Sequence, residues 1–367
     1  MRVTLLPGIW PPDVGGPATH GPELARFLVA RGDSVRVVTM ASAPPAERPC
    51  EIVTVDRGRP FPIRYGALTA RAARSARSAD VVYASATYGA AALAAAAARR
   101  PLVVKLVSDP AYERARRLGV FRGQLDEFQT AGAPAAKALR AARTAVLRRA
   151  AAMIVPSRFL EAFARAWGVD PERLHVVPNP APFDLPAADG ARSGLVFAGR
   201  LTSQKALHVA LAALERVPNV ELTIIGEGPE RERLERHARE AGLNGRVHFA
   251  GSLPRQQVLE SLARAQAAVL PSDWENFPHA AVEALAVGTP LVATAVGGVG
   301  EIVVDGVNGL LVPPGSPEAL GAALERLLGS EELQQQLSRQ ARASVAGLQP
   351  ERIYGRIAEL LEAVLRP

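Results

Sequence analysis

The chain of 367 residues has one cysteine, Cys50, and only 5% aromatic residues. A single cysteine excludes an intrachain disulfide framework and any cluster held by several thiolates, and it suits a reducing compartment. No apolar run approaches the roughly 18 residues that span a bilayer. The longest, residues 90–98, has nine and is nearly all alanine. Residues 1–10 lead into a Pro/Gly loop too early for a secretory signal. We therefore expect a cytoplasmic protein.

The sequence also lacks several catalytic signatures. The glycine-rich loop near residue 15 is not a G-x-G-x-x-G fingerprint, and no Walker A lysine follows it. The six histidines show no H-x-x-x-H spacing, and no serine nucleophile elbow is present. We therefore expect chemistry without a bound metal and without a protein nucleophile.

Positive charge is unevenly distributed, although the net charge is only +7. Residues 1–179 carry a balance of +12 and residues 180–367 one of −5, and only three of the basic residues are lysines. Coding bias explains the abundance of arginine but should affect both halves alike. The basic half predicts an anionic ligand or peripheral contact with an anionic membrane surface, with a merely soluble basic surface as the alternative. On a helix, Arg71, Arg74 and Arg77 would share roughly one face.

Short apolar runs alternate with helical patterns in both halves of the chain. The strand candidates are residues 2–6, 34–39, 52–55, 81–84, 102–107, 153–155, 194–198, 221–225, 247–249, 268–270 and 291–294. This alternation predicts two doubly wound, Rossmann-like α/β domains with parallel sheets and a cleft between them. The proline-rich stretch 177–189 reads as the linker. We expect domains over residues 1–180 and 181–347, followed by a C-terminal helix within 348–367.

The first candidate binding segment contains Gly15 and Gly16, between a predicted strand and a helix starting near Thr19. Paired glycines let backbone N–H groups approach an anion, and a helix N-terminus favours negative charge. A flexible turn is the alternative interpretation.

The second segment, Gly199, Arg200 and Leu201, follows a predicted strand, and Lys205 lies five residues after the arginine. Two cations facing a cleft can neutralise a diphosphate, although two solvated surface cations would give the same pattern. A third segment, Gly226-Glu227-Gly228-Pro229, is interpreted mainly as a turn.

The fourth segment holds two glutamates eight residues apart, Glu275 and Glu283. Pro278 suits the first turn of a helix, which puts Glu275 on a loop and Glu283 inside the helix. An anion at this helix start would meet the backbone N–H groups of Asn276, Phe277 and His279. A helix-start acidic residue plus a surface glutamate is the alternative.

Together these segments resemble the retaining glycosyltransferases of family 4, which have the GT-B fold. The resemblance covers almost the whole chain and depends on the order and spacing of its motifs. They are Gly15, Gly16, Gly199, Arg200, Leu201, Lys205, the 226–229 turn, Glu275, Glu283-Ala284-Leu285-Ala286, Gly288-Thr289-Pro290, Gly297, Gly298, Glu301 and the 305–309 turn.

The resemblance implies a nucleotide-diphosphate sugar as donor, bound mostly by the second domain. Arg200 and Lys205 would hold the diphosphate, Glu283 the ribose hydroxyls and Glu275 the transferred sugar. Gly15 and Gly16 would close over the phosphates, and the loop around Leu253 would lie near the nucleobase. The family needs no metal or other cofactor. The acceptor, a sugar, a lipid-linked glycan or a small molecule, would bind the first domain, onto which the final helix would cross back.

One position departs from the family pattern. Many members have a histidine in the loop after the fifth strand of the first domain, where this chain has Asp109 followed by Pro110. Asp109 is the closest positional substitute and a candidate base for the acceptor hydroxyl. A turn-forming Asp-Pro pair is the alternative.

Other functions are consistent with parts of the pattern. A nucleotide-sugar epimerase or a phosphorylase could share a two-domain fold. An arginine-rich nucleic-acid-binding protein is a different class, against which stand the few aromatic residues and the acidic second half. We expect no nucleic-acid partner.

Overall fold

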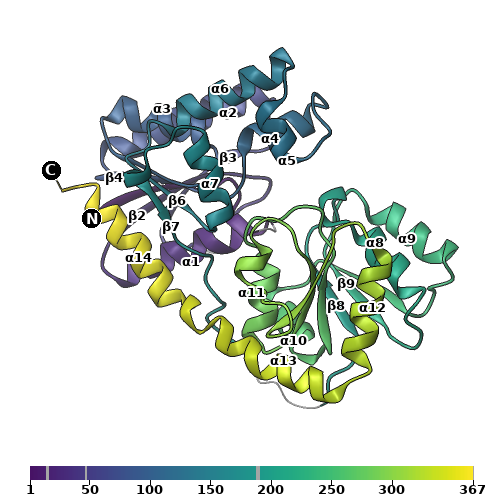
Figure 1. Ribbon diagram of the computed structural model, residues 1–367. Coiled ribbons are helices and arrows are strands. Elements are labelled where there is room, and N and C mark those ends of the chain that lie inside the picture. The colour runs from purple at the N-terminus through teal and green to yellow at the C-terminus, as the bar shows by residue number, and fades with distance from the viewer. Residues whose placement is uncertain (14–15, 46–47, 187–190, 367) are drawn as a thin grey trace. The chain divides into compact units, whose positions relative to one another are not determined.

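The computed structural model describes residues 1–13, 16–45, 48–186 and 191–366. The chain forms two compact units (Figure 1). Unit 1 comprises Met1–Val177 with Tyr354–Pro367, and unit 2 comprises Pro178–Ile353. Each unit is an α/β domain built on a parallel sheet, which confirms the predicted fold class.

Within its described residues, unit 1 has a seven-stranded sheet in the order β3-β2-β1-β4-β5-β6-β7. Its strands are β1 Arg2–Leu6, β2 Ser34–Ala41, β3 Glu51–Asp56, β4 Val81–Ala84, β5 Leu102–Lys105, β6 Ala152–Val155 and β7 Leu174–Val176. The helices that precede residue 178 are α1 Gly16–Ala30, α2 Phe61–Arg77, α3 Tyr88–Ala98, α4 Pro110–Arg117, α5 Leu125–Thr130, α6 Pro134–Leu147 and α7 Arg158–Ala166. Every residue of β4, β5 and β6 is buried, as expected where helices cover both faces of a parallel sheet.

Two helix boundaries in unit 1 differ from the prediction. Helix α1 begins at Gly16 rather than near Thr19. The helical spacing of residues 135–152 gives a helix only as far as Leu147, because Ala152 already belongs to β6. Alanine suits both a helix and a buried strand, so its spacing alone does not mark this boundary.

The last helix, α14 Pro350–Ala363, packs on α1 from Tyr354 onward. The Tyr354 hydroxyl donates to Glu23 Oε2 at 2.7 Å, and its ring lies 5.6 Å from that of His20. Arg31 and Glu362 add an ion pair at 3.0 Å. Tyr354 is fully buried, so this end of the chain contributes to the core of unit 1.

Unit 2 has, among the residues described, a six-stranded parallel sheet in the order β10-β9-β8-β11-β12-β13. Its strands are β8 Leu195–Ala198, β9 Leu222–Ile225, β10 Val247–Gly251, β11 Ala267–Leu270, β12 Leu291–Thr294 and β13 Gly309–Val312. Its helices are α8 Leu207–Leu214, α9 Arg231–Glu240, α10 Arg255–Arg264, α11 His279–Ala286, α12 Pro317–Leu328 and α13 Glu331–Ser344. One continuous apolar core joins this sheet to its helices.

Candidate functional site

In the sheet of unit 2, β8 and β11 are neighbours, and the strands that follow each of them in the chain are added in opposite directions. From β8 the chain proceeds to β9 and β10 on one side, and from β11 to β12 and β13 on the other. Loops that leave the carboxyl ends of two such strands diverge, and ligands of doubly wound sheets bind in the crevice between them. The segments 199–205 and 271–278 are these two loops, and the sequence analysis singled out both.

Lys205 and Glu275 meet at this point. Lys205 ends a short 3-10 helix, Ser203–Lys205, and its Nζ lies 2.5 Å from Glu275 Oε1. The Ser272 hydroxyl donates to the same Oε1 at 2.7 Å. The side chains of Lys205 and Glu275 are only 16% and 7% exposed. An ion pair this shielded from water is stronger than one on an open surface, and it holds both groups in defined positions.

Hydrogen bonds to main-chain carbonyls fix the two loops to each other. Gln204 Nε2 donates to the carbonyl of Trp274 at 2.8 Å, and the Asp273 N–H donates to the carbonyl of Gln204 at 2.9 Å. Beneath them, the Thr294 hydroxyl donates to the carbonyl of Ser272 at 2.5 Å. The Lys205–Glu275 pair is therefore preorganised by the backbone of both loops.

Arg200 is exposed on a loop that two glycines hold against the next strand. A Cβ on Gly226, whose φ is +137°, would lie 1.9 Å from the carbonyl oxygen of Gly199. A Cβ on Gly228 would lie 2.2 Å from the carbonyl oxygen of Leu201. Such distances admit no side chain, so the 226–229 segment does more than turn the chain: its glycines allow the two backbones that position Arg200 to pack together.

Glu283 occupies a second acidic position, on the wall of α11. As the sequence predicts, Glu275 lies on the loop and Glu283 within the helix, although Pro278 precedes the first helical turn instead of belonging to it. Glu283 Oε1 accepts from Arg255 Nε at 3.3 Å, and the glutamate side chain is 14% exposed. Arg255 was not predicted, because nothing in the spacing of residues along the sequence links the start of α10 to α11.

Three of the remaining predicted residues of unit 2 lie on the 271–278 loop or directly after it. Asn276 and Phe277 are buried, and His279, the first residue of α11, is half-buried. Asn179 Nδ2 donates to the carbonyl of Phe277 at 2.8 Å, a contact that the sequence analysis missed. Leu253 is partly buried and packs against the core of unit 2.

In unit 1, Gly16 is the first residue of α1, whereas Gly15 lies outside the described residues. The phosphate contact predicted for these glycines stays a prediction.

Asp109 has a structural environment that explains its position. It caps the N-terminus of α4, accepting from the Ala111 N–H at 2.9 Å, and is fully buried. Its Oδ2 accepts from Arg143 Nη1 at 2.6 Å and from Gln129 Nε2 at 3.1 Å. Both carboxylate oxygens are therefore occupied inside unit 1. This arrangement favours a structural role of the Asp-Pro pair, which starts helix α4 where a turn was the predicted alternative, over the role of a base facing the acceptor.

Lys105 is a buried cation that the sequence analysis did not select. It is the last residue of β5 and 1% exposed, and its Nζ has no hydrogen-bond partner within the described parts of the chain. Burial lowers the pKa of this ammonium group from 10.5 to about 7. Its rarity as one of three lysines was the only available signal.

Two kinds of site are absent from the described residues. No three His, Cys, Asp or Glu side chains gather there in a way that could hold a metal ion. None of the helices described is long and apolar enough to cross a membrane.

Known families match both units of the chain. Residues 15–180 match the family described as "Glycosyl transferase 4-like domain", and residues 187–344 match "Glycosyl transferases group 1". The chain is therefore built from two glycosyltransferase domains.

Curated relatives are similar over part of their length. Glycogen synthase of Mycobacterium tuberculosis is 40% identical over 163 residues, covering 42% of this chain and 39% of that protein. D-inositol 3-phosphate glycosyltransferase of Xylanimonas cellulosilytica is 34% identical over 207 residues, covering 50% of each. The alignments thus span half or less of these two relatives.

Solved structures share the GT-B fold over nearly the whole chain. Sucrose-phosphate synthase from Thermosynechococcus elongatus has a TM-score of 0.82 at 21% identity, covering 99% of this chain and 98% of that one. Anabaena HepE in complex with UDP-glucose has a TM-score of 0.78 at 21% identity, covering 99% and 100%. At these identities the likeness establishes the fold.

Proposed function

We propose that this protein transfers a sugar from a nucleotide-diphosphate sugar to an acceptor hydroxyl, with retained anomeric configuration and without a metal ion. The observation that carries the proposal is the shielded Lys205–Glu275 pair, 2.5 Å apart at the switch point of unit 2, within a glycosyltransferase domain. The UDP-glucose complex of a protein with the same fold supports a nucleotide sugar as donor.

Arg200 and Lys205 bind the diphosphate in this proposal. The exposed guanidinium offers a planar fork, and the lysine a point charge that Glu275 already positions. As the bond between the sugar and the phosphate oxygen lengthens, negative charge grows on the leaving diphosphate. Two positioned cations stabilise that charge in the place of a metal ion.

Glu275 and Glu283 bind hydroxyl groups of the donor at different ends. Both side-chain bonds of Glu275 within the described structure use Oε1, which leaves Oε2 to accept from a hydroxyl of the transferred sugar. Glu283 is held by Arg255 and accepts from the ribose hydroxyls.

The acceptor hydroxyl attacks the anomeric carbon from the face that the diphosphate leaves. The new C–O bond forms as the old one breaks, and a phosphate oxygen of the leaving group takes the hydroxyl proton. No protein nucleophile takes part. The basic charge balance of residues 1–179 supports an acceptor that is anionic or lies at an anionic surface.

The test is release of nucleoside diphosphate from a panel of nucleotide sugars, chosen by thermal shift, with and without candidate acceptors. A transferase releases the diphosphate in step with acceptor glycosylation, also in the presence of EDTA. Conversion of the donor sugar without an acceptor would indicate an epimerase instead. Activity that EDTA abolishes and magnesium or manganese restores would overturn the metal-free mechanism.

A further inference from the structure

A buried asparagine of the linker contacts the loop that carries Glu275. Asn179 lies two residues after Val177, where the first segment of unit 1 ends, and is only 4% exposed. Its Nδ2 donates to the carbonyl of Phe277 at 2.8 Å, and both residues belong to unit 2. Phe277 follows Glu275 by two residues, so the linker is bonded directly to the 271–278 loop.

The residues around Asn179 restrict its backbone. Pro178 precedes it with φ fixed at about −65°, and Pro180 confines Asn179 itself to extended conformations. The next residue, Ala181, donates its N–H to the carbonyl of Leu348 at 2.8 Å. The side chain of Asn179 is therefore presented from a backbone that has little conformational entropy left to lose.

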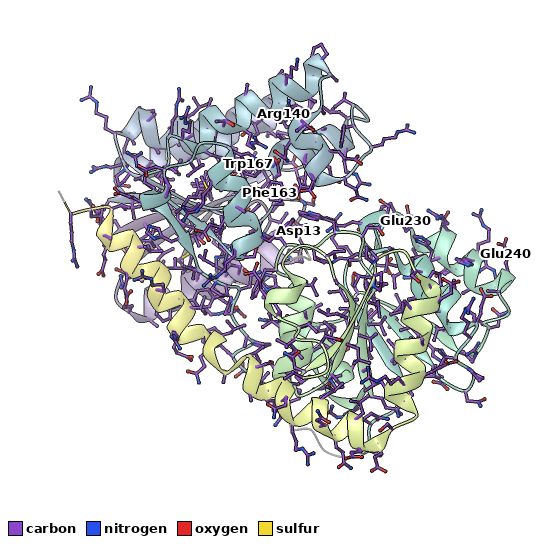
Figure 2. The ribbon with its side chains drawn as sticks, in the orientation of Figure 1. Asp13, Arg140, Phe163, Trp167, Glu230 and Glu240 are labelled. Carbon is purple, nitrogen blue, oxygen red and sulfur yellow. The ribbon has the colours of Figure 1, made fainter. Side chains whose placement is uncertain are left out.

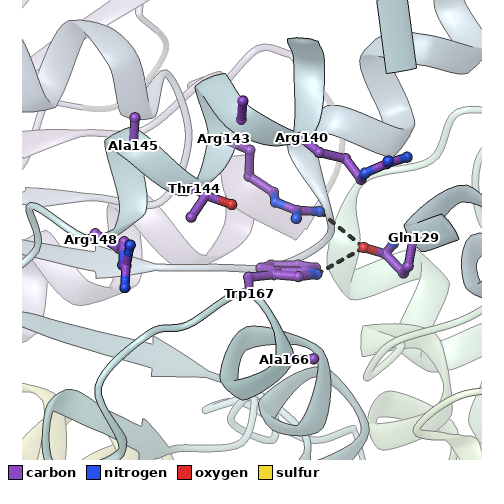
Figure 3. A pocket seen from close by; sticks show the side chains of 9 residues that line it. Gln129, Arg140, Arg143, Thr144, Ala145, Arg148, Ala166 and Trp167 are labelled. Carbon is purple, nitrogen blue, oxygen red and sulfur yellow. Dashed lines mark hydrogen bonds between the residues drawn. The ribbon is translucent and has the colours of Figure 1, made fainter. Parts of the chain in front are cut away.

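Only half of the Asn179 amide is used, as a comparison with the side-chain amide of Gln129 shows. Gln129 Oε1 accepts from Arg143 Nη1 at 3.2 Å and from Trp167 Nε1 at 2.8 Å (Figure 3). Its Nε2 donates to Asp109 Oδ2 at 3.1 Å. These residues belong to unit 1, where Trp167 is labelled in Figure 2. Asn179 Oδ1, in contrast, is buried without a hydrogen-bond partner in the described structure.

This unused oxygen makes Asn179 poorly suited to a purely stabilising role. The free-energy cost of an unsatisfied buried acceptor is comparable to the net gain from one neutral hydrogen bond, or larger. An apolar side chain at this position would avoid that cost. What the amide provides instead is a directed bond to one carbonyl, that of Phe277.

Two further hydrogen bonds attach the same loop to unit 2. The Asp273 N–H donates to the carbonyl of Gln204 at 2.9 Å, and the Gly298 N–H donates to the carbonyl of Glu275 at 3.3 Å. Residues 273, 275 and 277 are thus bonded to three different segments, and the linker is the last of the three. Because these bonds fall at Glu275 and on both sides of it, the loss of one allows its carboxylate to move.

We infer that Asn179 is a positioning residue for the proposed sugar transfer: through the Phe277 carbonyl it holds Glu275 where the transferred sugar binds. A displacement of about 1 Å that originates outside the reacting centre can slow a reaction about a hundredfold, so one bond at this distance in the chain matters for turnover. The role in transfer rests on the proposed function, whereas the ordering of the loop by Asn179 does not.

Hydrogen exchange of the ligand-free full chain tests the ordering of the loop. Asn179→Asp is nearly isosteric, but a carboxylate cannot donate to a carbonyl. The Asp273 and Gly298 N–H groups should exchange about tenfold faster than in the parent protein, the scale for one hydrogen bond. Asn308→Asp is the matched control, because Asn308 is also buried and its Nδ2 donates to the carbonyl of Ile302 at 2.9 Å, outside the loop. Unchanged exchange in Asn179→Asp, or an equal increase in Asn308→Asp, would overturn the inference.

Kinetics and donor binding test the role of Asn179 in the reaction. Asn179→Asp should lower kcat about ten- to hundredfold and weaken the intact donor, while free nucleoside diphosphate, which lacks the sugar, binds as tightly as to the parent protein. A loss of stability alone would reduce the amount of folded enzyme and leave both ligands equally affected. Asn179→Gln, which keeps the amide donor, should retain part of the turnover. Asn179→Ala, which adds no charge, replaces Asn179→Asp if that variant does not fold.

The outcomes separate this inference from the proposed function. Faster exchange in the loop with unchanged kcat per folded molecule would refute the role of Asn179 in transfer while the proposed function stands. A parent protein that transfers sugar from no donor would refute the proposed function and with it the role in transfer, and the exchange rates would still decide whether Asn179 orders the loop.

Discussion

Lys105 places an ammonium group inside unit 1, where burial disfavours its charged form. Its pKa is about 7 in the folded protein, against 10.5 for an ordinary lysine. Between these two values the unfolded chain binds more protons, so the free energy of unfolding should rise with pH by up to about 1.4 kcal/mol per unit. Below pH 7 Lys105 is charged in both the folded and the unfolded state, so the full free-energy cost of burying the ammonium group remains.

We therefore predict that Lys105→Met stabilises the protein most below about pH 7, with a gain that shrinks as the pH rises toward 10. The measurement is the free energy of unfolding of both proteins by urea at several pH values. Lys137→Met, at an exposed lysine, is the control and should show no such trend. If the difference in the free energy of unfolding between the two proteins did not change with pH, the lowered pKa of the buried Lys105 would be contradicted.

Asp109 should contribute to the stability of the folded protein rather than to proton transfer. Asp109→Asn keeps a capping oxygen but removes the charge that pairs with the buried Arg143. Breaking a buried pair costs about 3–5 kcal/mol, so we expect a large drop in the free energy of unfolding. Turnover per folded molecule should stay close to that of the parent protein.

The control for this prediction is Glu161→Gln, which removes the partner of the exposed Arg165 and should change stability by less than about 1 kcal/mol. An Asp109→Asn protein of normal stability with greatly reduced turnover would instead restore Asp109 as the base.

At the scale of elements, loop 271–278 and helix α11 divide the recognition of the donor. Glu283→Gln should weaken both free nucleoside diphosphate and intact donor about ten- to hundredfold, because it removes a charged hydrogen bond to the nucleotide. Glu275→Gln should weaken only the intact donor, because the sugar is absent from the free diphosphate. Calorimetric titration of each variant with both ligands measures the difference. Equal losses for both ligands in both variants would contradict the division.

Most of the elements could be predicted from the sequence, since buried parallel strands appear as short apolar runs. Strands β7 and β13 and helices α4, α5, α7, α12 and α13 were not predicted individually. The short helix α5 depends on contacts from residues distant in the sequence, such as the bond from Arg140 to the carbonyl of Phe128. Sequence spacing carries no information about such contacts.

The individual residues of the candidate site could be predicted from the sequence, but their contacts could not. Lys205 and Glu275 were selected individually because each follows a strand, but their pairing depends on β8 and β11 being neighbours in the sheet. Arg255 was not predicted because its partner, Glu283, lies on another element. In a chain with 40 arginines, no single arginine stands out.

For the whole molecule, the charge asymmetry predicts association with anionic membranes. Arg71, Arg74 and Arg77 are exposed along α2, and each basic residue near an anionic bilayer contributes about 1 kcal/mol. The protein should sediment with anionic but not neutral vesicles at low salt, and dissociate at high salt because charges are screened. Replacing these three arginines by alanine should weaken binding more than replacing Arg233, Arg236 and Arg239, which have the same spacing on α9. If the protein did not bind anionic vesicles at low salt, membrane association would be rejected and a soluble acceptor would remain as the interpretation.

The most direct test of the proposed sugar transfer at the switch point of unit 2 is the turnover of Lys205→Ala at saturating donor. Lys205 is positioned to stabilise the charge of the departing diphosphate, so turnover should fall by about two to three orders of magnitude while the fold is retained. Lys137→Ala, at an exposed lysine of unit 1, should retain the parent rate. A Lys205→Ala protein that turns over saturating donor at nearly the parent rate would contradict the account.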